Sequence, residues 1–318
     1  MDGLYELLHR NIATSDKGRD GFFDIHNSYS SPGFWTAYAA RARSRNLRLQ
    51  DLTISNSNTL GYAKAIAIER ALGQRDTYSH ERIRAGDNYS PLVLLESREE
   101  TDGATGEINR CIRGLFGESP YAEFVASICE LVGDLLDNVW AHGKSTGFSM
   151  AQKWRDPPDG FLLEFAVADC GMGFLRELRR VGIPDIADDR AAIEWCIQPG
   201  NSTKKRDVDE WEQRLPADVM GHPMGRFGRV VESDNHHMGL GLAKLITAVE
   251  KFHGWCWLAS GNAMLYISPD GQRTYTNLPI PWQGVALACR FDPSRVAGTA
   301  LQYTEDEFED ILAQLMRD

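Results

Sequence analysis

The order of helices and strands expected in the last two thirds of the chain constrains its fold more than any other feature. Residues 122–142 have the pattern of one long helix, and Gly143 stands where helices favour a left-handed cap. Two β-like runs follow at 147–154 and 161–168, with turn-forming residues between them. A long irregular stretch then leads to the remaining expected elements: a helix at 240–252 and three antiparallel strands at 255–260, 263–267 and 285–291. The order helix, strands, insert, helix, strands predicts an α/β domain.

The first part of the chain predicts a smaller α/β unit, in which strands and helices alternate. The polar stretch 73–90 has the composition of a linker. We therefore expect two domains, one at 1–88 and one at 89–300, and residues 301–318 have the pattern of an amphipathic terminal helix. In the smaller unit, strands are expected at 22–25 and 47–54, and helices at 34–45 and 59–72.

Composition excludes several classes of protein. Hydrophobic residues make up 42% of the 318 residues, enough to bury a sizeable core. The formal net charge of -11 argues against broad binding to nucleic acid, which requires neutralisation of phosphates. No run approaches about 18 apolar residues, so no transmembrane helix is expected, and the first residues lack the pattern of a secretory signal. The six cysteines form no CxxC pair, so a reducing cytoplasm is the simplest expected location.

The first group of chemically interesting residues lies on the helix at 122–142. Asp134, Asn138 and His142 are four residues apart, and four-residue steps keep side chains on one side of a helix. A carboxylate one turn from a carboxamide can orient water and hold Mg²⁺ through oxygen ligands. The alternative is the solvated face of an amphipathic helix, and for this helix taken alone that alternative is favoured.

The second group directly follows the apolar run at 161–168. Asp169 stands at the expected strand end, where a carboxylate can accept a hydrogen bond from an exocyclic amine such as that of adenine. Gly171 and Gly173 allow a ring to approach the backbone closely. The alternative is an ordinary tight turn.

The third group opens the expected helix at 240–252. Gly239, Leu240, Gly241 and Leu242 form a GxGL sequence, and glycines before a helix leave backbone N–H groups free to bind an anion. A GxG sequence is common, so this group predicts little when it stands alone.

Taken together, the three groups resemble the GHKL superfamily, which contains gyrase, heat-shock chaperone, histidine kinase and mismatch-repair ATPases. The steps from Asn138 to Asp169 and from Asp169 to Gly239 lie within the range of that family, and the resemblance covers roughly residues 108–293. It implies a C-terminal two-layer α/β sandwich, the Bergerat ATP-binding fold, beside the small N-terminal α/β unit. It also implies ATP and Mg²⁺ as ligands.

The resemblance also implies roles for single residues. Asn138 would bind Mg²⁺, Asp169 would read the adenine amine, and His142 would form part of the site. Asp134 stands where many members have a glutamate general base, and aspartate is one methylene shorter, so its competence as a base is open. The remaining implied ATP-binding residues are Gly171 and Gly173 around the base and Gly239, Leu240, Gly241 and Leu242 around the phosphates.

Residues 174–238 correspond to the ATP lid of the family. A polar and basic stretch at 200–206 includes Thr203 and Lys204, which would meet the terminal phosphates when the lid closes. A solvated loop, balanced by nearby acidic residues, is an equally weighted alternative.

The N-terminal unit weakly resembles the STAS domains of anti-sigma-factor antagonists. In that family a serine at a helix start is phosphorylated by a GHKL-type kinase, and Ser30 and Ser31 precede Pro32 at such a start. The favoured alternative is that both serines are capping residues.

Two classes of function remain. The first is a Mg²⁺-dependent ATPase that signals to a protein partner or to its own N-terminal unit, with an anti-sigma-type serine kinase as a variant. The second is a nucleotide-gated binding module that does not hydrolyse ATP. Neither class predicts a membrane or nucleic-acid partner, and the family resemblance is compatible with a homodimer.

Overall fold

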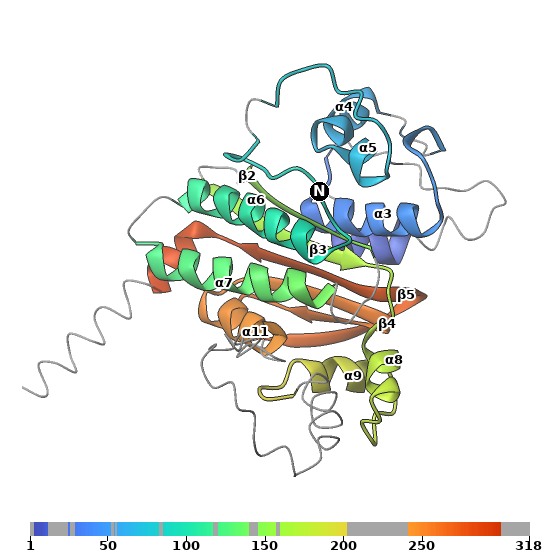
Figure 1. The fold of residues 1–318 in the computed structure, drawn as a ribbon. Helices are drawn as coiled ribbons and strands as arrows, with labels where there is room; N and C mark the ends of the chain where they lie inside the picture. Colours follow the sequence, from blue (N-terminus) through green and yellow to red (C-terminus); the bar gives the residue numbers. More distant parts are fainter. Residues whose placement is uncertain are drawn as a thin grey trace, which may run out of the picture.

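A five-stranded antiparallel sheet forms the centre of the molecule (Figure 1). The computed structural model describes residues 3–11, 25, 29–51, 54, 56–82, 85–116, 120–139, 146–156, 160–201 and 241–299. Within these residues the strand order is β1–β2–β3–β5–β4, which confirms a mixed α/β fold. The strands are β1 (Val93–Leu95), β2 (Gly147–Asp156), β3 (Gly160–Asp169), β4 (Trp255–Ile267) and β5 (Arg273–Phe291).

Alternate side chains of β3 contribute to a buried core on each face of the sheet. Leu163, Phe165 and Val167 belong to one buried cluster, whereas Ala166 and Ala168 belong to another. Successive side chains of a strand point to opposite faces, so one strand contributes to both clusters. The β2–β3 pair confirms the strands expected at 147–154 and 161–168.

Three helices cover the first face. They are α6 (Arg98–Phe116), α7 (Ala122–Asn138) and α11 (Gly241–Lys251), and their apolar sides join the first cluster (Figure 1). Helix α11 confirms the helix expected at 240–252, and α7 confirms the expected long helix as far as Asn138. The last part of that expected helix, with His142 and Gly143, lies outside the described residues. None of the helices among the described residues is long and apolar enough to span a membrane.

Helix α3 (Pro32–Ser44) lies on the opposite face and confirms the helix expected at 34–45. Small side chains on the strands let it approach closely: a Cβ atom on Gly33 would lie 2.8 Å from the Cβ atom of Ala288. The expected two-layer sandwich therefore has a third layer, because α3 packs on β2, β3 and β5. The short segments α1 (Leu4–Glu6) and η1 (Leu7–Asn11) pack beside α3.

The N-terminal elements depart from the expected alternation of strands and helices. The helix expected at 59–72 is two helices, α4 (Ser57–Ala65) and α5 (Ile68–Ala71), separated at Ala67, whose φ of 64° is left-handed. The strand expected at 47–54 is wrong, since a 3-10 turn, η2 (Leu49–Asp51), stands there. The strand expected at 22–25 lies outside the described residues except for Ile25.

The domain boundary expected near residue 88 stays a prediction. Buried residues on both sides of it, such as Trp35 and Met150, belong to one cluster. The N-terminal helices therefore complete the core of the sheet's second face.

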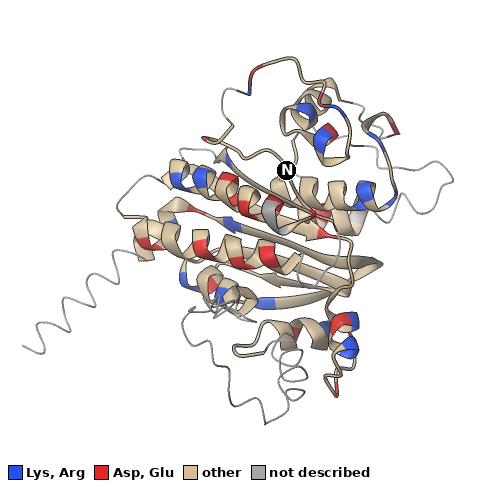
Figure 2. Ribbon diagram, viewed as in Figure 1, with Lys and Arg blue, Asp and Glu red and all other residues tan. Residues whose placement is uncertain are grey.

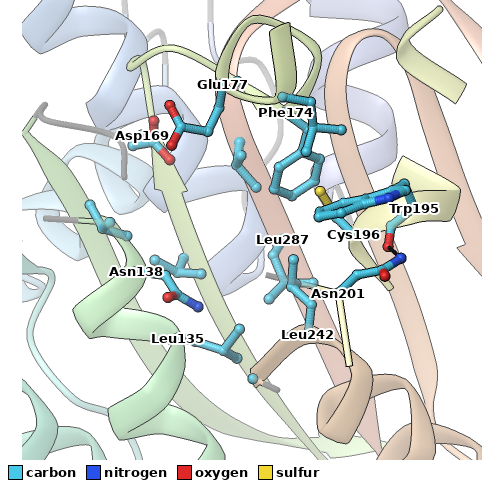
Figure 3. A pocket seen from close by; sticks show the side chains of 16 residues that line it. Leu135, Asn138, Asp169, Phe174, Glu177, Trp195, Cys196, Asn201, Leu242 and Leu287 are labelled. Atoms are coloured by element: carbon cyan, nitrogen blue, oxygen red, sulfur yellow. Dashed lines mark hydrogen bonds between the residues drawn. The ribbon is translucent and has the colours of Figure 1, made fainter. Parts of the chain in front are cut away.

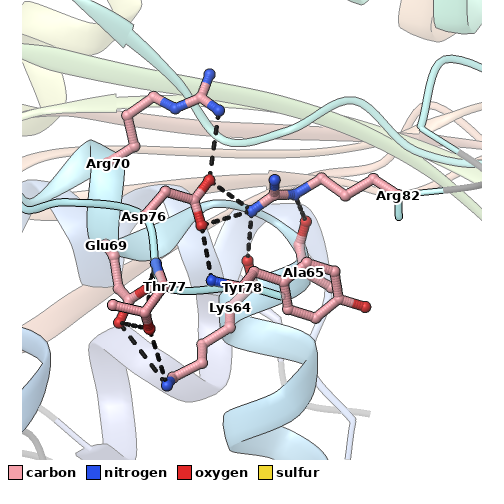
Figure 4. Close-up of polar contacts among 8 residues, drawn as sticks. All are labelled: Lys64, Ala65, Glu69, Arg70, Asp76, Thr77, Tyr78 and Arg82. Atoms are coloured by element: carbon pink, nitrogen blue, oxygen red, sulfur yellow. Dashed lines mark hydrogen bonds and ion pairs between the residues drawn. The ribbon is translucent and has the colours of Figure 1, made fainter. Parts of the chain in front are cut away.

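Polar contacts hold the stretch after α5 against α4 (Figure 4). Asp76 accepts hydrogen bonds from Arg82, Arg70 and the Tyr78 N–H, at distances of 2.8–3.4 Å. Arg82 also donates to the carbonyls of Lys64 and Ala65 at the end of α4, at 3.0 and 2.7 Å. Partial burial raises the pKa of Asp76, but the hydrogen bonds from Arg82 and Tyr78 outweigh it and hold that pKa below 3.8.

The last strands are longer than expected. The strands expected at 255–260 and 263–267 are one strand, β4, with a register shift at Gly261, whose φ of 59° suits glycine. Strand β5 contains the expected 285–291 but begins at Arg273. The start of the expected lid folds into two short helices, α8 (Phe174–Arg180) and α9 (Asp189–Cys196).

Candidate functional site

A mostly apolar cavity opens between α7, the end of β3, helices α8 and α9, and the start of α11 (Figure 3). Its volume is about 130 Å³. Pockets of this kind, apolar with a few converging polar groups, are the usual form of small-molecule sites. The apolar lining includes Leu135, Val139, Val167, Leu178, Leu242 and Leu287.

Parts of all three groups expected from the sequence meet at this cavity. Asn138, Asp169, Gly173, Gly241 and Leu242 line it, although they come from three widely separated segments. Of the other expected site residues, Asp134 and Gly171 are described but do not line the cavity, whereas His142, Thr203, Lys204, Gly239 and Leu240 lie outside the described residues.

Two carboxylates of the cavity lining are buried. Glu177, with 7% of its surface exposed, pairs with Arg180 at 2.8 Å. Asp169 lies at the end of β3, with 4% of its surface exposed. Its Oδ1 atom accepts a hydrogen bond from the Gly171 N–H at 2.7 Å. Burial raises the pKa of Asp169 to about 7, and hydrogen bonds from the Gly171 and Val285 backbones oppose that rise. Asp169 sits at an apolar cavity, and no cation contributes to the shift of its pKa. Its carboxylate is therefore suited to receive a donor group from a ligand.

Close backbone packing fixes the Asp169 loop. A Cβ atom on Gly284, whose φ is 93°, would lie 2.4 Å from the Asp169 carbonyl oxygen. A Cβ atom on Gly173, whose φ is 74°, would likewise lie 3.1 Å from the Gly284 carbonyl oxygen. The Ser260 hydroxyl joins the two segments, since it accepts from the Phe174 N–H at 3.0 Å and donates to the Gly284 carbonyl at 2.9 Å. The sequence predicted Gly173 as a site residue. Gly284 on β5 lacks a side chain, and this allows the Gly173 backbone to lie against it.

The start of α11 packs directly on the polar side of α7. A Cβ atom on Gly241 would lie 3.2 Å from the Asp134 Cβ atom and 3.3 Å from the Asn138 Nδ2 atom. Asp134 and Asn138 therefore face α11 and do not form a solvated helix face. The N-terminal backbone of a helix at this position favours an anion.

Asp134 does not line the cavity but lies next to it. Its Oδ2 atom is 3.4 Å from the Lys244 Nζ atom, and its side chain is 13% exposed. Lys244 also donates to Glu130 Oε1 at 2.7 Å. The candidate base is therefore part of an ion pair that the sequence did not suggest.

An aromatic wall of the cavity was missed from the sequence. Phe174 and Trp195 stand opposite Asn138 and Leu135 (Figure 3). Asn201 donates to the Trp195 carbonyl at 2.9 Å and so ties the end of α9 to the cavity. Phe174 directly follows the Asp169–Gly173 group, which is a usable signal, whereas nothing in the local sequence distinguishes Trp195.

Ser30 and Ser31 lie far from solvent, with 1% and 0% of their surface exposed. Ser31 donates to Glu164 Oε1 at 2.6 Å, and the Gly33 N–H donates to the same oxygen at 2.8 Å. A carboxylate from β3 thus caps α3, and the Ser31 side chain makes no cap of its own. Burial weighs against either serine as a phosphate acceptor.

Comparisons of the chain with known protein families, with curated proteins and with solved structures find no match. The residues of the site therefore define its class. An apolar cavity holds two buried carboxylates at one end, Asp169 and the Arg180-paired Glu177, and a helix N-terminus beside an amide and a carboxylate at the other. These two ends suit a ligand with an aromatic, amine-bearing part and an anionic part.

Proposed function

We propose that this chain binds ATP with Mg²⁺ and hydrolyses it in the manner of the GHKL superfamily. The observation that carries the proposal is the convergence of Asn138, Asp169 and Gly241 on one cavity. These residues belong to the three sequence groups that carry the family resemblance. Their chemistry matches the parts of the ligand in the same order, namely metal, base amine and phosphates.

The adenine would enter the apolar part of the cavity. Asp169 would accept the hydrogen bond from its exocyclic amine, and the aromatic wall of Phe174 and Trp195 would contact its ring. The Gly171 N–H occupies one acceptor site of Asp169, and other lone pairs of the carboxylate stay open to donors from a ligand.

The phosphates would lie at the start of α11. The Gly241 backbone supplies the helix N-terminus, and the Asn138 amide oxygen would be a ligand of Mg²⁺. Mg²⁺ bound through a triphosphate keeps several waters and needs few protein ligands, so one amide fits this role. By the family resemblance, Thr203 and Lys204 of the lid would contact the terminal phosphates, and His142 would complete the site.

Asp134 would orient the attacking water, one turn from Asn138. Its ion pair with Lys244 favours a second candidate function, a nucleotide-gated module that hydrolyses little or no ATP. Asp134→Glu separates the two: hydrolysis that is absent in the wild type and present in this variant supports the gated module.

A route for signalling to the N-terminal region runs along β3. Cys170 follows Asp169 directly and belongs to the same buried cluster as Ala40 and Ala42 of α3. A change in the Asp169 loop on nucleotide binding would therefore reach α3, and through it a protein partner.

The test is incubation with γ-labelled ATP and Mg²⁺, with separation of free phosphate from protein-bound label. Asn138→Ala is the test variant, and Asp137→Ala, at an exposed neighbouring position that does not line the cavity, is its matched control. Release of phosphate by the wild type and the control, and its loss in Asn138→Ala, supports the ATPase. Label on the protein supports the kinase variant. Failure of the wild type to bind ATP at all removes the proposal.

A further inference from the structure

Lys244 occupies a special place in the described part of α11. It lies three residues after Gly241 and therefore faces the same side of the helix, toward α7. Its ammonium group is shared by Glu130, at 2.7 Å, and Asp134, at 3.4 Å. It is thus a cation within one helical turn of the backbone to which the proposed function assigns the phosphates.

The charges around Lys244 show why a cation is needed there. Acidic side chains follow one another along α7, and lysines of α11 lie beside them (Figure 2). Asp134 is only 13% exposed, so water screens its charge poorly. A triphosphate at the start of α11 would lie close to the carboxylates of Asp134 and Glu130. Like charges that lie close together in a poorly screened place repel strongly unless a cation lies between them.

A second ion pair joins the same two helices at their other end. Lys251 of α11 pairs with Glu123 of α7, and neither Lys251 nor Lys244 lines the cavity. The two lysines make the same kind of contact between the same helices, but only Lys244 lies near Asn138 and Gly241. This pair provides an internal control for the effect of an ion pair on helix packing alone.

We propose that Lys244 determines the preference of the site for ATP over ADP, an inference that rests on the proposed function. In the nucleotide-free protein its ammonium group neutralises Asp134 and Glu130. When ATP binds, the same positive charge faces the third phosphate, which ADP lacks. Lys244 then compensates the charge of Asp134 at the point where the γ-phosphate comes closest to it.

The experiment is equilibrium binding of ATP and of ADP, each with Mg²⁺, to the full chain. We expect Lys244→Met to weaken ATP binding by about tenfold and ADP binding by less than about threefold, because only the third phosphate loses its cation. Lys244→Arg keeps the charge and should keep the ATP preference. Lys251→Met removes the distant ion pair and should change neither affinity.

A further variant acts in the opposite direction. Glu130→Gln removes one of the two carboxylates that share Lys244, so we expect ATP binding to strengthen by about twofold to threefold while ADP binding stays the same. Since Glu130 is 56% exposed, this change should leave the fold intact.

The outcomes separate the two proposals. If the wild type binds neither nucleotide, the proposed function fails and the inference falls with it. If the wild type binds both nucleotides and Lys244→Met weakens both equally, or neither, the inference is overturned and the proposed function stands. Equal effects of Lys244→Met and Lys251→Met would likewise reduce Lys244 to a structural contact between helices.

Discussion

Glu164 and Asp169 lie on the same strand, β3, and point to opposite faces of the sheet. Both are almost fully buried, with 1% and 4% of their surface exposed. Beneath α3, Glu164 accepts hydrogen bonds from the Ser31 hydroxyl, the Gly33 N–H and two nitrogens of Arg290. Arg290 itself lies between the rings of Trp154 and Trp257, 5.1 Å from each centroid. Asp169 has backbone N–H partners and a cavity beside it.

The difference in hydrogen-bond partners distinguishes a structural carboxylate, Glu164, from one suited to bind a ligand, Asp169. Glu164 is satisfied by protein donors and a cation, so it has no capacity left for a ligand and serves to dock α3 on the sheet. Asp169 bears the cost of burial without a cation, which is why its pKa rises to about 7. Natural proteins keep such an uncompensated group where function requires it.

The largest expected effect on stability comes from removing Glu164, the carboxylate whose acceptor sites are all used by protein donors. Glu164→Ala leaves Arg290 and the start of α3 without their shared acceptor, and removal of one partner of a buried ion pair costs about 3–5 kcal/mol. We expect the free energy of unfolding, measured by urea denaturation, to fall by that amount. The matched control is Glu194→Ala, whose exposed pair with Arg190 is worth less than about 1 kcal/mol. A loss at Glu164 as small as that at Glu194 would remove the distinction between the two faces.

A substitution of Asp169, on the cavity face of the sheet, should instead raise the free energy of unfolding. Asp169→Asn replaces a buried carboxylate by a neutral group that can still accept from the Gly171 N–H. One pKa unit corresponds to about 1.4 kcal/mol, and the pKa of Asp169 rises from 3.8 to about 7, so the stability gained at pH 8 is at most about 4 kcal/mol. ATP binding should be lost in the same variant, because the acceptor for the base amine is weakened and partly replaced by a donor.

The pH dependence of that gain is a separate check. Below pH 3.8 Asp169 is protonated in both the folded and the unfolded chain, so the two proteins should differ little. Between about pH 4 and pH 7 only the unfolded chain releases the proton, and the wild type therefore loses stability relative to Asp169→Asn as the pH rises. Above pH 7 the difference should be constant. A difference in melting temperature that is the same at pH 4.5 and pH 8 would contradict the raised pKa.

The sequence predicted the parts of the fold that have regular apolar spacing. Helices α7 and α11 and strands β2 and β3 were expected close to their observed bounds. Helix α6 was not, because Gly103, Gly106 and Gly114 disfavour a helix locally, and only packing of its apolar side on the sheet stabilises it. The first part of β5 was missed because Pro279 and Pro281 cannot donate ladder hydrogen bonds and so argue against a strand.

The candidate site was predictable where chemistry follows from local spacing. Asn138, Asp169, Gly173 and Gly241 come from short motifs, and the described structure brings them to one cavity. Trp195, Glu164 and Lys244 could not be found in this way, since their roles depend on neighbours that are distant in the chain. The pairing of Lys244 with Asp134, for example, joins residues of two helices that are separated in the chain by two strands and the insert.

The packing that shapes the cavity face gives the third expected effect. Gly284→Ala places a methyl group 2.4 Å from the Asp169 carbonyl, at a φ of 93° that other residues rarely adopt. We expect a loss of about 1–3 kcal/mol in the free energy of unfolding, together with weaker nucleotide binding. Gly61→Ala, in α4 with no atom within 4 Å of the new methyl group, should instead stabilise the protein by about 0.5–1 kcal/mol. Equal losses at the two glycines would show that close packing at Asp169 is not the cause.

The smallest effect is expected at a third carboxylate, which is paired like Glu164 but reached by water. Asp76 has Arg70 and Arg82 as partners, and its side chain is 21% exposed. Because the folded-state pKa is lowered, Asp76 stabilises the fold at neutral pH, and that contribution is lost as the pH falls below about 4. Asp76→Asn should therefore cost less than about 1 kcal/mol at pH 7 and almost nothing at pH 3, as measured by urea denaturation. A cost as large as that of Glu164→Ala would mean that pairing alone, without burial, sets the stability contributed by a carboxylate in this protein.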